Sequence, residues 1–198
     1  MTQIIEDGGR SSGNTMSAEV LSRIEEYLWP KGYSRDAWML VDAARDRRIF
    51  ELLLECFYSQ HSCLFAGPIA AELQVAAPYL VQLSHDDKKT RKFLQMAWGN
   101  SWGVFVKCNQ RLEILRKHLR TFLLVRDEEG NQLMFRYYDP RILRIYLPTC
   151  RVGELETVFG PIERFLMEDE ASEGLLEFSF DRKQLVMTRH SLSEPASV

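Results

Sequence analysis

The pattern of apolar and polar residues changes its period repeatedly along the chain, which predicts strands and helices in alternation. Short, densely apolar segments predict strands at 38–43, 62–66, 79–83, 102–108, 121–126, 132–138, 164–168, 175–180 and 184–189. Apolar residues at helical spacing predict helices at about 17–29, 46–57, 86–98, 109–122, 140–147 and 154–159. This alternation predicts a mixed α/β (α+β) fold, with a central mixed sheet, flanking helices and a small strand-rich C-terminal lobe.

The segment from Gln132 to Leu147 changes from strand to helix within a few residues. Asp139 is a good helix N-cap, because its carboxylate accepts orphan backbone N–H groups, and Pro140 suits the first helical position. We therefore interpret Asp139 as a structural cap. The preceding strand is expected to have two faces, one formed by Leu133, Phe135 and Tyr137 and the other by Met134, Arg136 and Tyr138. Arg and Tyr are enriched at protein interfaces, so the second face is a candidate contact surface if no helix covers it.

The same segment resembles a family of type VI secretion effector chaperones, or adaptors, catalogued as a domain of unknown function. The resemblance rests on Phe-Arg-Tyr-Tyr-Asp-Pro-Arg-Ile-Leu at 135–143 and on four other pieces that keep the family's order. These are Trp-Met-Leu-Val-Asp-Ala-Ala at 38–44, Ala-Pro-Tyr-Leu-Val at 77–81, Trp-Gly-Asn-Ser-Trp-Gly at 98–103, and His-Leu-Arg followed by Thr-Phe-Leu-Leu-Val at 118–125. The likeness covers residues 38–148, and residues 1–37 and 149–198 show none.

The resemblance implies a protein that acts by binding alone. Such chaperones load a toxic effector onto the VgrG spike in the cytoplasm, so we expect an effector and VgrG as partners, no nucleic acid, no membrane, and neither cofactor nor metal. The oligomeric state stays open. We divide the chain into a disordered lead-in at 1–16, an adaptor domain at 17–148, a small helical and strand-rich lobe at 149–190 and a flexible tail at 191–198.

The net charge of −3 is unevenly distributed along the chain. Residues 88–151 contain 14 Lys or Arg and 5 Asp or Glu, a net charge of +9, whereas the rest contains 11 and 23, a net charge of −12. The basic helix faces are either simply solvated or a surface for an acidic partner segment; nucleic-acid binding is disfavoured by the overall acidity. The residues expected to contact a partner are Arg116, Lys117 and Arg120 on one helix, and Arg136, Tyr138, Arg141 and Trp102 elsewhere.

Sequence motifs for catalysis or metal binding are missing from the chain. It has no Walker loop, dinucleotide fingerprint or nucleophile elbow. Asp42 comes near the end of a predicted strand, where a capping or salt-bridge role competes with a catalytic one. Asp42 and His85 form the basis of the alternative hypothesis, a small-molecule enzyme on a mixed α/β scaffold. The four scattered cysteines predict free thiols packed as small apolar groups, which suits a reducing cytoplasm.

The two ends of the chain add little chemistry. The N-terminus lacks the basic start and apolar core of a secretory signal, and no apolar run approaches the roughly 18 residues of a membrane-spanning helix. The C-terminal strands, with Phe178, Phe180 and Met187, either complete the sheet or offer an apolar surface or an open edge to an effector segment.

Overall fold

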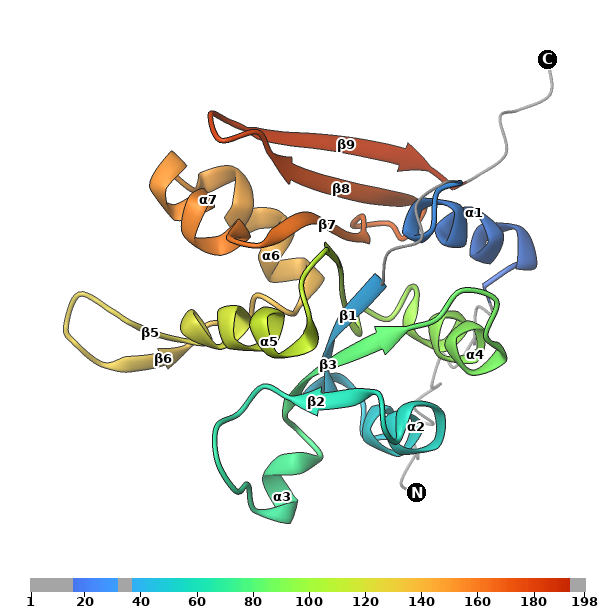
Figure 1. Cartoon of the computed structure of the whole chain (residues 1–198), viewed down its shortest axis with the longest axis horizontal. Coiled ribbons are helices and arrows are strands. Elements are labelled where there is room, and N and C mark those ends of the chain that lie inside the picture. The colour runs from blue at the N-terminus through green and yellow to red at the C-terminus, as the bar shows by residue number, and fades with distance from the viewer. Residues whose placement is uncertain (1–15, 32–36, 193–198) are drawn as a thin grey trace, which may run out of the picture.

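Seven strands of the described chain form one sheet, and helices cover both of its faces (Figure 1). The structure is a computed structural model that describes residues 16–31 and 37–192. The strands follow the order β2-β3-β1-β4-β7-β8-β9, with antiparallel pairing between all neighbours. The α+β class expected from the sequence is confirmed, but the expectation of a mixed sheet is wrong, because every strand pair in this sheet is antiparallel. The strand bounds are β1 Ala37–Asp42, β2 His61–Cys63, β3 Pro78–Leu83, β4 Gly103–Cys108, β7 Ile162–Glu168, β8 Gly174–Phe180 and β9 Leu185–Ser191.

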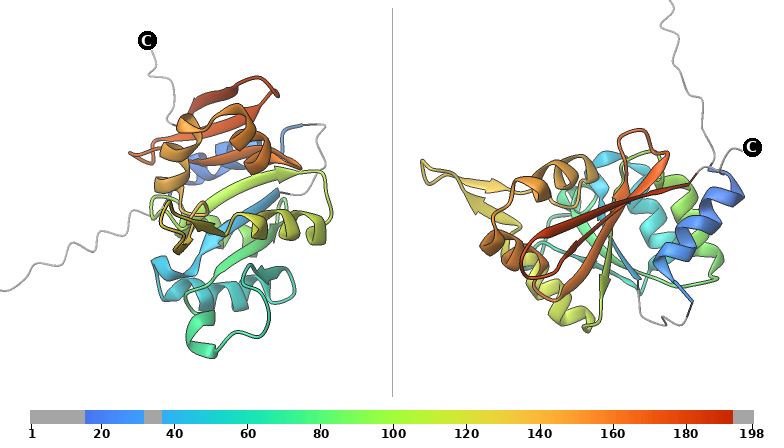
Figure 2. Two further views of the ribbon diagram at one scale, coloured as in Figure 1. Left: turned by 90° about the vertical axis from the view of Figure 1, so that its left-hand side faces the viewer. Right: turned by 90° about the horizontal axis from the view of Figure 1, so that it is seen from above.

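The helices form two layers, one on each face of the sheet (Figure 2). The first hydrophobic cluster receives the apolar sides of α1 (Ala18–Leu28), α2 (Arg48–Phe57) and α4 (Lys88–Ala97). The second cluster receives those of α5 (Leu112–Thr121), α6 (Pro140–Tyr146) and α7 (Val152–Phe159). Side chains alternate across a strand, so β1 contributes Met39 and Val41 to the first cluster and Trp38 and Leu40 to the second. Burial on both faces explains why β1 reads as a continuous apolar run.

The C-terminal strands extend the main sheet. β7 pairs with β4, and β8 and β9 then follow as antiparallel neighbours. Phe178 of β8 is fully buried, whereas Met187 of β9 is 57% exposed at the end of the sheet. The strand-rich C-terminal region is thus present, and it completes the sheet, which is one of the two roles that the sequence left open for it.

A separate hairpin of two strands, β5 (Leu124–Arg126) and β6 (Gln132–Met134), projects away from the body of the molecule (Figures 1 and 2). The prediction of a strand over 132–138 is wrong for its second half, since β6 ends at Met134. The chain then turns, and the N–H of Asp139 donates to the carbonyl of Arg136 at 3.0 Å. This turn buries Tyr137, whose hydroxyl donates to the carbonyl of Leu119 at 2.7 Å. Burying the ring of Tyr137 with its hydroxyl hydrogen-bonded stabilises this turn more than the alternating pattern of residues 132–138 favours a continued strand.

The predicted helix starts are confirmed where an aspartate or serine accepts a backbone N–H. Ser17, Asp87 and Asp139 occupy the N-caps of α1, α4 and α6. The helix expected from about residue 109 begins later, at Leu112, and the preceding Arg111 makes no side-chain capping bond. A single-turn helix, α3 (Ala71–Gln74), was not predicted; it buries no residue and so leaves no apolar pattern in the sequence.

Most of the lead-in and tail expected at 1–16 and 191–198 lies outside the described residues. The described residues at the inner ends of these two segments are folded, however, which contradicts the prediction for them. Met16 is buried against the first hydrophobic cluster, Ser191 ends β9, and Leu192 is 2% exposed. Met16, Ser191 and Leu192 therefore belong to the folded part of the chain and not to the lead-in and tail.

The cysteines and the helices bear on two further expectations. All four cysteines are free thiols, and Cys56 and Cys108 are buried as expected. Over the described ranges, no helix combines the length and apolar character needed to cross a membrane.

Candidate functional site

Two buried aspartates lie where the segment after the β5–β6 hairpin meets the end of β1. Asp42 ends β1, and its Oδ1 accepts the N–H of Ala44 at 3.1 Å, which caps the short 3-10 helix η1 (Ala43–Arg45). Asp139 caps α6 by accepting the N–H of Arg141 at 3.0 Å. The side chains of Asp42 and Asp139 are 1% and 0% exposed. A buried carboxylate stays charged at low cost only when a cation pairs with it and hydrogen bonds satisfy its oxygens.

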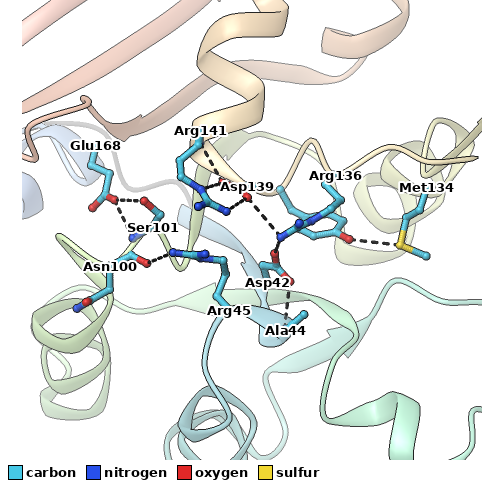
Figure 3. A network of polar contacts seen from close by, with 11 residues as sticks. Asp42, Ala44, Arg45, Asn100, Ser101, Met134, Arg136, Asp139, Arg141 and Glu168 are labelled. Carbon is cyan, nitrogen blue, oxygen red and sulfur yellow. Dashed lines mark hydrogen bonds and ion pairs between the residues drawn. The ribbon is translucent and has the colours of Figure 1, made fainter. Parts of the chain in front are cut away.

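Arg136 and Arg141 supply the positive charge (Figure 3). Nη2 of Arg136 lies 2.5 Å from Oδ2 of Asp42 and 3.3 Å from Oδ2 of Asp139. Arg141 binds Asp139 through two bonds, from Nε to Oδ1 at 3.0 Å and from Nη2 to Oδ2 at 2.7 Å. We name these four residues the arginine–aspartate cluster. Because Asp42 and Arg136 are 94 residues apart in the chain, the cluster ties the 135–141 segment to the end of β1.

Contacts within the cluster favour the charged forms of its residues. Burial alone would raise the pKa of Asp139, but the hydrogen bonds and charge of Arg141 and the charge of Arg136 outweigh it, so the pKa lies below its usual value. The hydrogen bond to Asp42 raises the pKa of Arg136, and the one to Asp139 raises that of Arg141. Asp139, Arg136 and Arg141 therefore stay ionised together across the physiological pH range.

The guanidinium groups of the cluster also face solvent. The side chains of Arg136 and Arg141 are 43% and 42% exposed, although their carboxylate partners are buried. A third guanidinium, that of Arg45, lies beside them and donates to the carbonyl of Asn100 at 3.4 Å (Figure 3). Nε of Arg45 is buried and has no hydrogen-bond partner among the described residues. Three arginines against two carboxylates leave a local excess of positive charge, which suits an acidic group of a partner.

Tyr138 takes a different position from the one predicted. It is 3% exposed, and its hydroxyl donates to Sδ of Met134 at 3.4 Å. Burial raises its pKa to about 12. The face of Met134, Arg136 and Tyr138 expected from the strand pattern does not form, because the chain turns after Met134. Tyr138 anchors the base of the hairpin, and of these three residues Arg136 and Met134 reach the surface.

The basic face of α5 is partly committed to the fold. Nε of Arg116 donates to the carbonyl of Cys63 at 3.0 Å, which fixes α5 against the end of β2. Lys117 is exposed and Arg120 is partly exposed, in the last two turns of the helix. Lys117 and Arg120 are therefore the available cations on this face, while Arg116 has a structural contact.

Trp102 is 2% exposed and packs edge to face with Phe93, with ring centroids 5.8 Å apart. The residue belongs to the first hydrophobic cluster, and its burial leaves little of the ring for the partner contact predicted from the sequence. The adjoining turn is held by the carboxylate of Glu168, which accepts the N–H of Gly99 at 2.6 Å and the N–H and hydroxyl of Ser101, each at 2.8 Å (Figure 3). Burial raises the pKa of Glu168.

Asp42 and His85, the residues of the alternative enzyme hypothesis, are not brought together. In the β1–β3 ladder Asp42 pairs with Pro78, whereas Leu83, two residues before His85, pairs with Ala37 at the other end of β1. Five residues of strand separate these ends by about 17 Å. Asp42 instead has the capping and salt-bridge role that competed with catalysis in the sequence interpretation.

The sequence did not reveal two polar contacts that shape this region. The Asp42–Arg136 pair has no local signal, because its members are far apart in the chain. Glu168 was assigned to a strand, and nothing in its neighbours indicates that it reaches across to the turn at 99–101. The proximity of Trp98-Gly-Asn-Ser-Trp-Gly103 to a buried acid could be found only from the tertiary fold.

The described residues, 16–31 and 37–192, contain no group of three or more His, Cys, Asp or Glu side chains arranged to hold a metal ion. A family model described as "Domain of unknown function (DUF4123)" matches residues 37–157. No curated protein and no solved structure shows a significant match. The matched range contains the whole arginine–aspartate cluster, α5 and the β5–β6 hairpin.

Proposed function

The chain belongs to the DUF4123 family, whose function is unknown, and from this premise we propose that it is a cytoplasmic effector chaperone, or adaptor, of type VI secretion. In this proposal it binds a toxic effector and helps to load it onto the VgrG spike. It acts through protein–protein contacts and carries out no reaction. The family-like pieces named in the sequence are the reason for choosing this function over other binding functions.

The observation that carries the proposal is the exposure of Arg136 and Arg141 on a buried aspartate frame. A surface arginine normally loses side-chain freedom when it binds a partner, and this loss weakens binding. Here Asp42 and Asp139 already fix both guanidinium groups. The planar groups are therefore preorganised, and arginine is the cation best suited to two-pronged contacts with a carboxylate.

Long-range charge supports the same function. Residues 88–151 carry a net charge of +9 in a chain whose total is −3. The exposed part of this charge includes Lys117 and Arg120 of α5 and the two arginines of the cluster. A basic surface of this kind attracts an acidic partner and increases the rate of encounter without any catalytic group.

The test is reconstitution with the two proposed partners. The chain would be co-expressed with the VgrG protein and the toxic effector encoded in its own gene cluster, and the mixture separated by size-exclusion chromatography. We expect a stoichiometric complex with at least one of them. Failure to bind either protein would contradict the adaptor function.

A matched pair of variants separates specific binding from general charge loss. Arg141→Gln removes a half-exposed arginine from the cluster, and Arg164→Gln removes one from β7, where Arg164 pairs with Glu177 at 3.1 Å and is 49% exposed. We expect Arg141→Gln alone to weaken the complex, with both variants folded by circular dichroism. Equal weakening by both variants would show that the cluster has no special role.

A further inference from the structure

We infer that the β5–β6 hairpin inserts into an apolar groove of a partner protein whose rim carries carboxylates. The inference rests on the proposed adaptor function and names the element that makes the contact. It follows from the hairpin's exposed side chains, the preorganised turn and the charges around the base.

The hairpin carries large aliphatic side chains on both of its faces. Leu124 lies opposite Met134, and Val125 lies opposite Leu133, so each cross-strand pair occupies one face. The four side chains are 36–49% exposed. Within the described part of the chain, β5 and β6 pair only with each other, and all their residues are exposed. An isolated two-stranded hairpin is marginally stable in water, so these apolar faces are costly for a free surface.

The turn of the hairpin is nevertheless fixed. Asp127 accepts the N–H of Asn131 at 2.7 Å and its amide group at 3.0 Å. The guanidinium of Arg126 donates to the carbonyl of Gly130 at 3.0 Å. Gly130 has a φ of +86°, which suits glycine and would strain most other residues. A turn built in this way keeps the hairpin in shape before it meets a partner, which lowers the entropic cost of binding.

The base of the hairpin is anchored to the molecule. The N–H of Phe135 donates to the carbonyl of Leu123 at 2.9 Å, and its ring packs on Tyr146 of α6, with centroids 4.6 Å apart. Ile142, one turn before Tyr146 on α6, is 41% exposed, so the apolar surface continues from the hairpin onto this helix. The hairpin is thus held at one end and free at the other, as its projection in Figure 1 shows.

The charges around the hairpin identify the occupant. Lys117, Arg120, Arg136 and Arg141 lie on the segments that flank its base, whereas its tip carries Asp127, Glu128 and Glu129. A partner that covers the base must therefore offer carboxylates beside its apolar surface. A second copy of this chain is a poorer occupant, because four partly exposed aliphatic side chains per hairpin contribute little to the roughly 1,200–2,000 Å² of a stable interface.

The experiment uses the full chain with purified VgrG and purified effector as probes. Val125→Ser with Leu133→Ser removes the aliphatic pair from one hairpin face, where both side chains are exposed and the fold should be unaffected. The matched control is Val186→Ser with Met187→Ser on β9, where the side chains are 39% and 57% exposed. We expect the hairpin variant to weaken binding to one probe by about tenfold or more, and the control by less than about twofold.

Hydrogen exchange of the wild-type chain gives a second readout that needs no variant. The amides of 124–134 should exchange more slowly in the complex than in the free protein, while those of 185–191 should not change. Binding that the hairpin variant leaves intact, with unchanged exchange at 124–134, would overturn the inference and leave the adaptor function standing. If the hairpin variant loses self-association but keeps its binding to the probes, the hairpin forms a dimer contact, and the inference is also overturned. If wild-type chain binds neither probe, both proposals fail.

Discussion

Two buried carboxylates in different regions of this molecule, Asp139 and Glu168, are stabilised in different ways. In the family-matched region, residues 37–157, Asp139 faces the guanidinium groups of Arg136 and Arg141, and its pKa is lowered. In the C-terminal strands, Glu168 is equally buried but accepts only N–H and hydroxyl donors among the bonds described, and its pKa is raised. Whether a buried acid has a cationic partner, and not its burial alone, decides whether its pKa is raised or lowered.

The two regions also differ in what their ion pairs connect. Arg136 and Asp42 link segments 94 residues apart, whereas Arg164 and Glu177 lie on the neighbouring strands β7 and β8. The first pair fixes an irregular segment whose backbone has few ladder bonds. The second pair adds a side-chain contact between two strands that backbone hydrogen bonds already hold together. Similar arginine–carboxylate contacts therefore have a positional role in one region and a minor one in the other.

The largest expected effect is that of Arg136→Ala. The variant leaves the carboxylate of Asp42 buried without its cation, so the free energy of unfolding should fall by about 3 kcal/mol. Arg164→Ala, at a partly exposed pair, should cost only about 0.5 kcal/mol. Urea unfolding followed by circular dichroism would measure both. Equal losses would remove the distinction between the two regions.

Asp139 gives the next largest effect and separates capping from charge pairing. Asp139→Ala removes the cap and both arginine contacts and should cost about 2 kcal/mol, more than the ~1 kcal/mol of a cap alone. Asp139→Asn keeps a capping oxygen but loses the charge, and should cost about 1 kcal/mol. Thermal unfolding of the two variants is the measurement. An Asn variant as stable as wild type would mean that Asp139 acts only as a cap.

The same residues show what the sequence could and could not reveal. The cap at Asp139 was predictable, because Asp-Pro before an apolar helical pattern is a local signal. The strands of the C-terminal region were predictable for a similar reason, since 175–180 and 184–189 are short, densely apolar segments of the sequence. The arginine contacts of Asp139 and Asp42 were not predictable, because they depend on how the chain turns after Met134 and on a pairing across the fold. Burial of Tyr138 and Trp102 likewise follows from tertiary packing.

Charge reversal on α5 should change association kinetics more than stability. Lys117→Glu with Arg120→Glu should reduce the on-rate for the acidic partner several-fold, and added salt should reduce the wild-type rate in the same direction. Lys88→Glu with Lys89→Glu is the control, because these exposed lysines lie on α4, which belongs to the other helix layer. Surface plasmon resonance would report the rates. An on-rate that responds equally to both double variants would reflect the net charge and not this surface.

The smallest expected effect concerns the pH dependence that Glu168 gives to the C-terminal region. Its pKa in the folded protein lies above the usual 4.5 because burial disfavours the charged carboxylate. The stability it contributes is therefore fully present below pH 4.5 and is lost as the pH rises through the folded pKa. Asp139 has the opposite sign: its pKa lies below 3.8, so its contribution is present above that value and is lost only as the pH falls further. His118, whose pKa is lowered by burial, contributes stability that is lost as the pH falls below about 6.5.

The measurement is the difference in unfolding free energy between wild type and Glu168→Gln, obtained by urea titration from pH 4 to pH 8. Asp139 and His118 are present in both proteins, so this difference isolates the contribution of Glu168. We expect this difference to shift in favour of the Gln variant as the pH rises, by less than the loss in Arg136→Ala. A difference that stays constant with pH would mean that the hydrogen bonds from the turn at 99–101 fully offset the cost of burying the charged carboxylate, so that folding leaves the pKa of Glu168 unchanged.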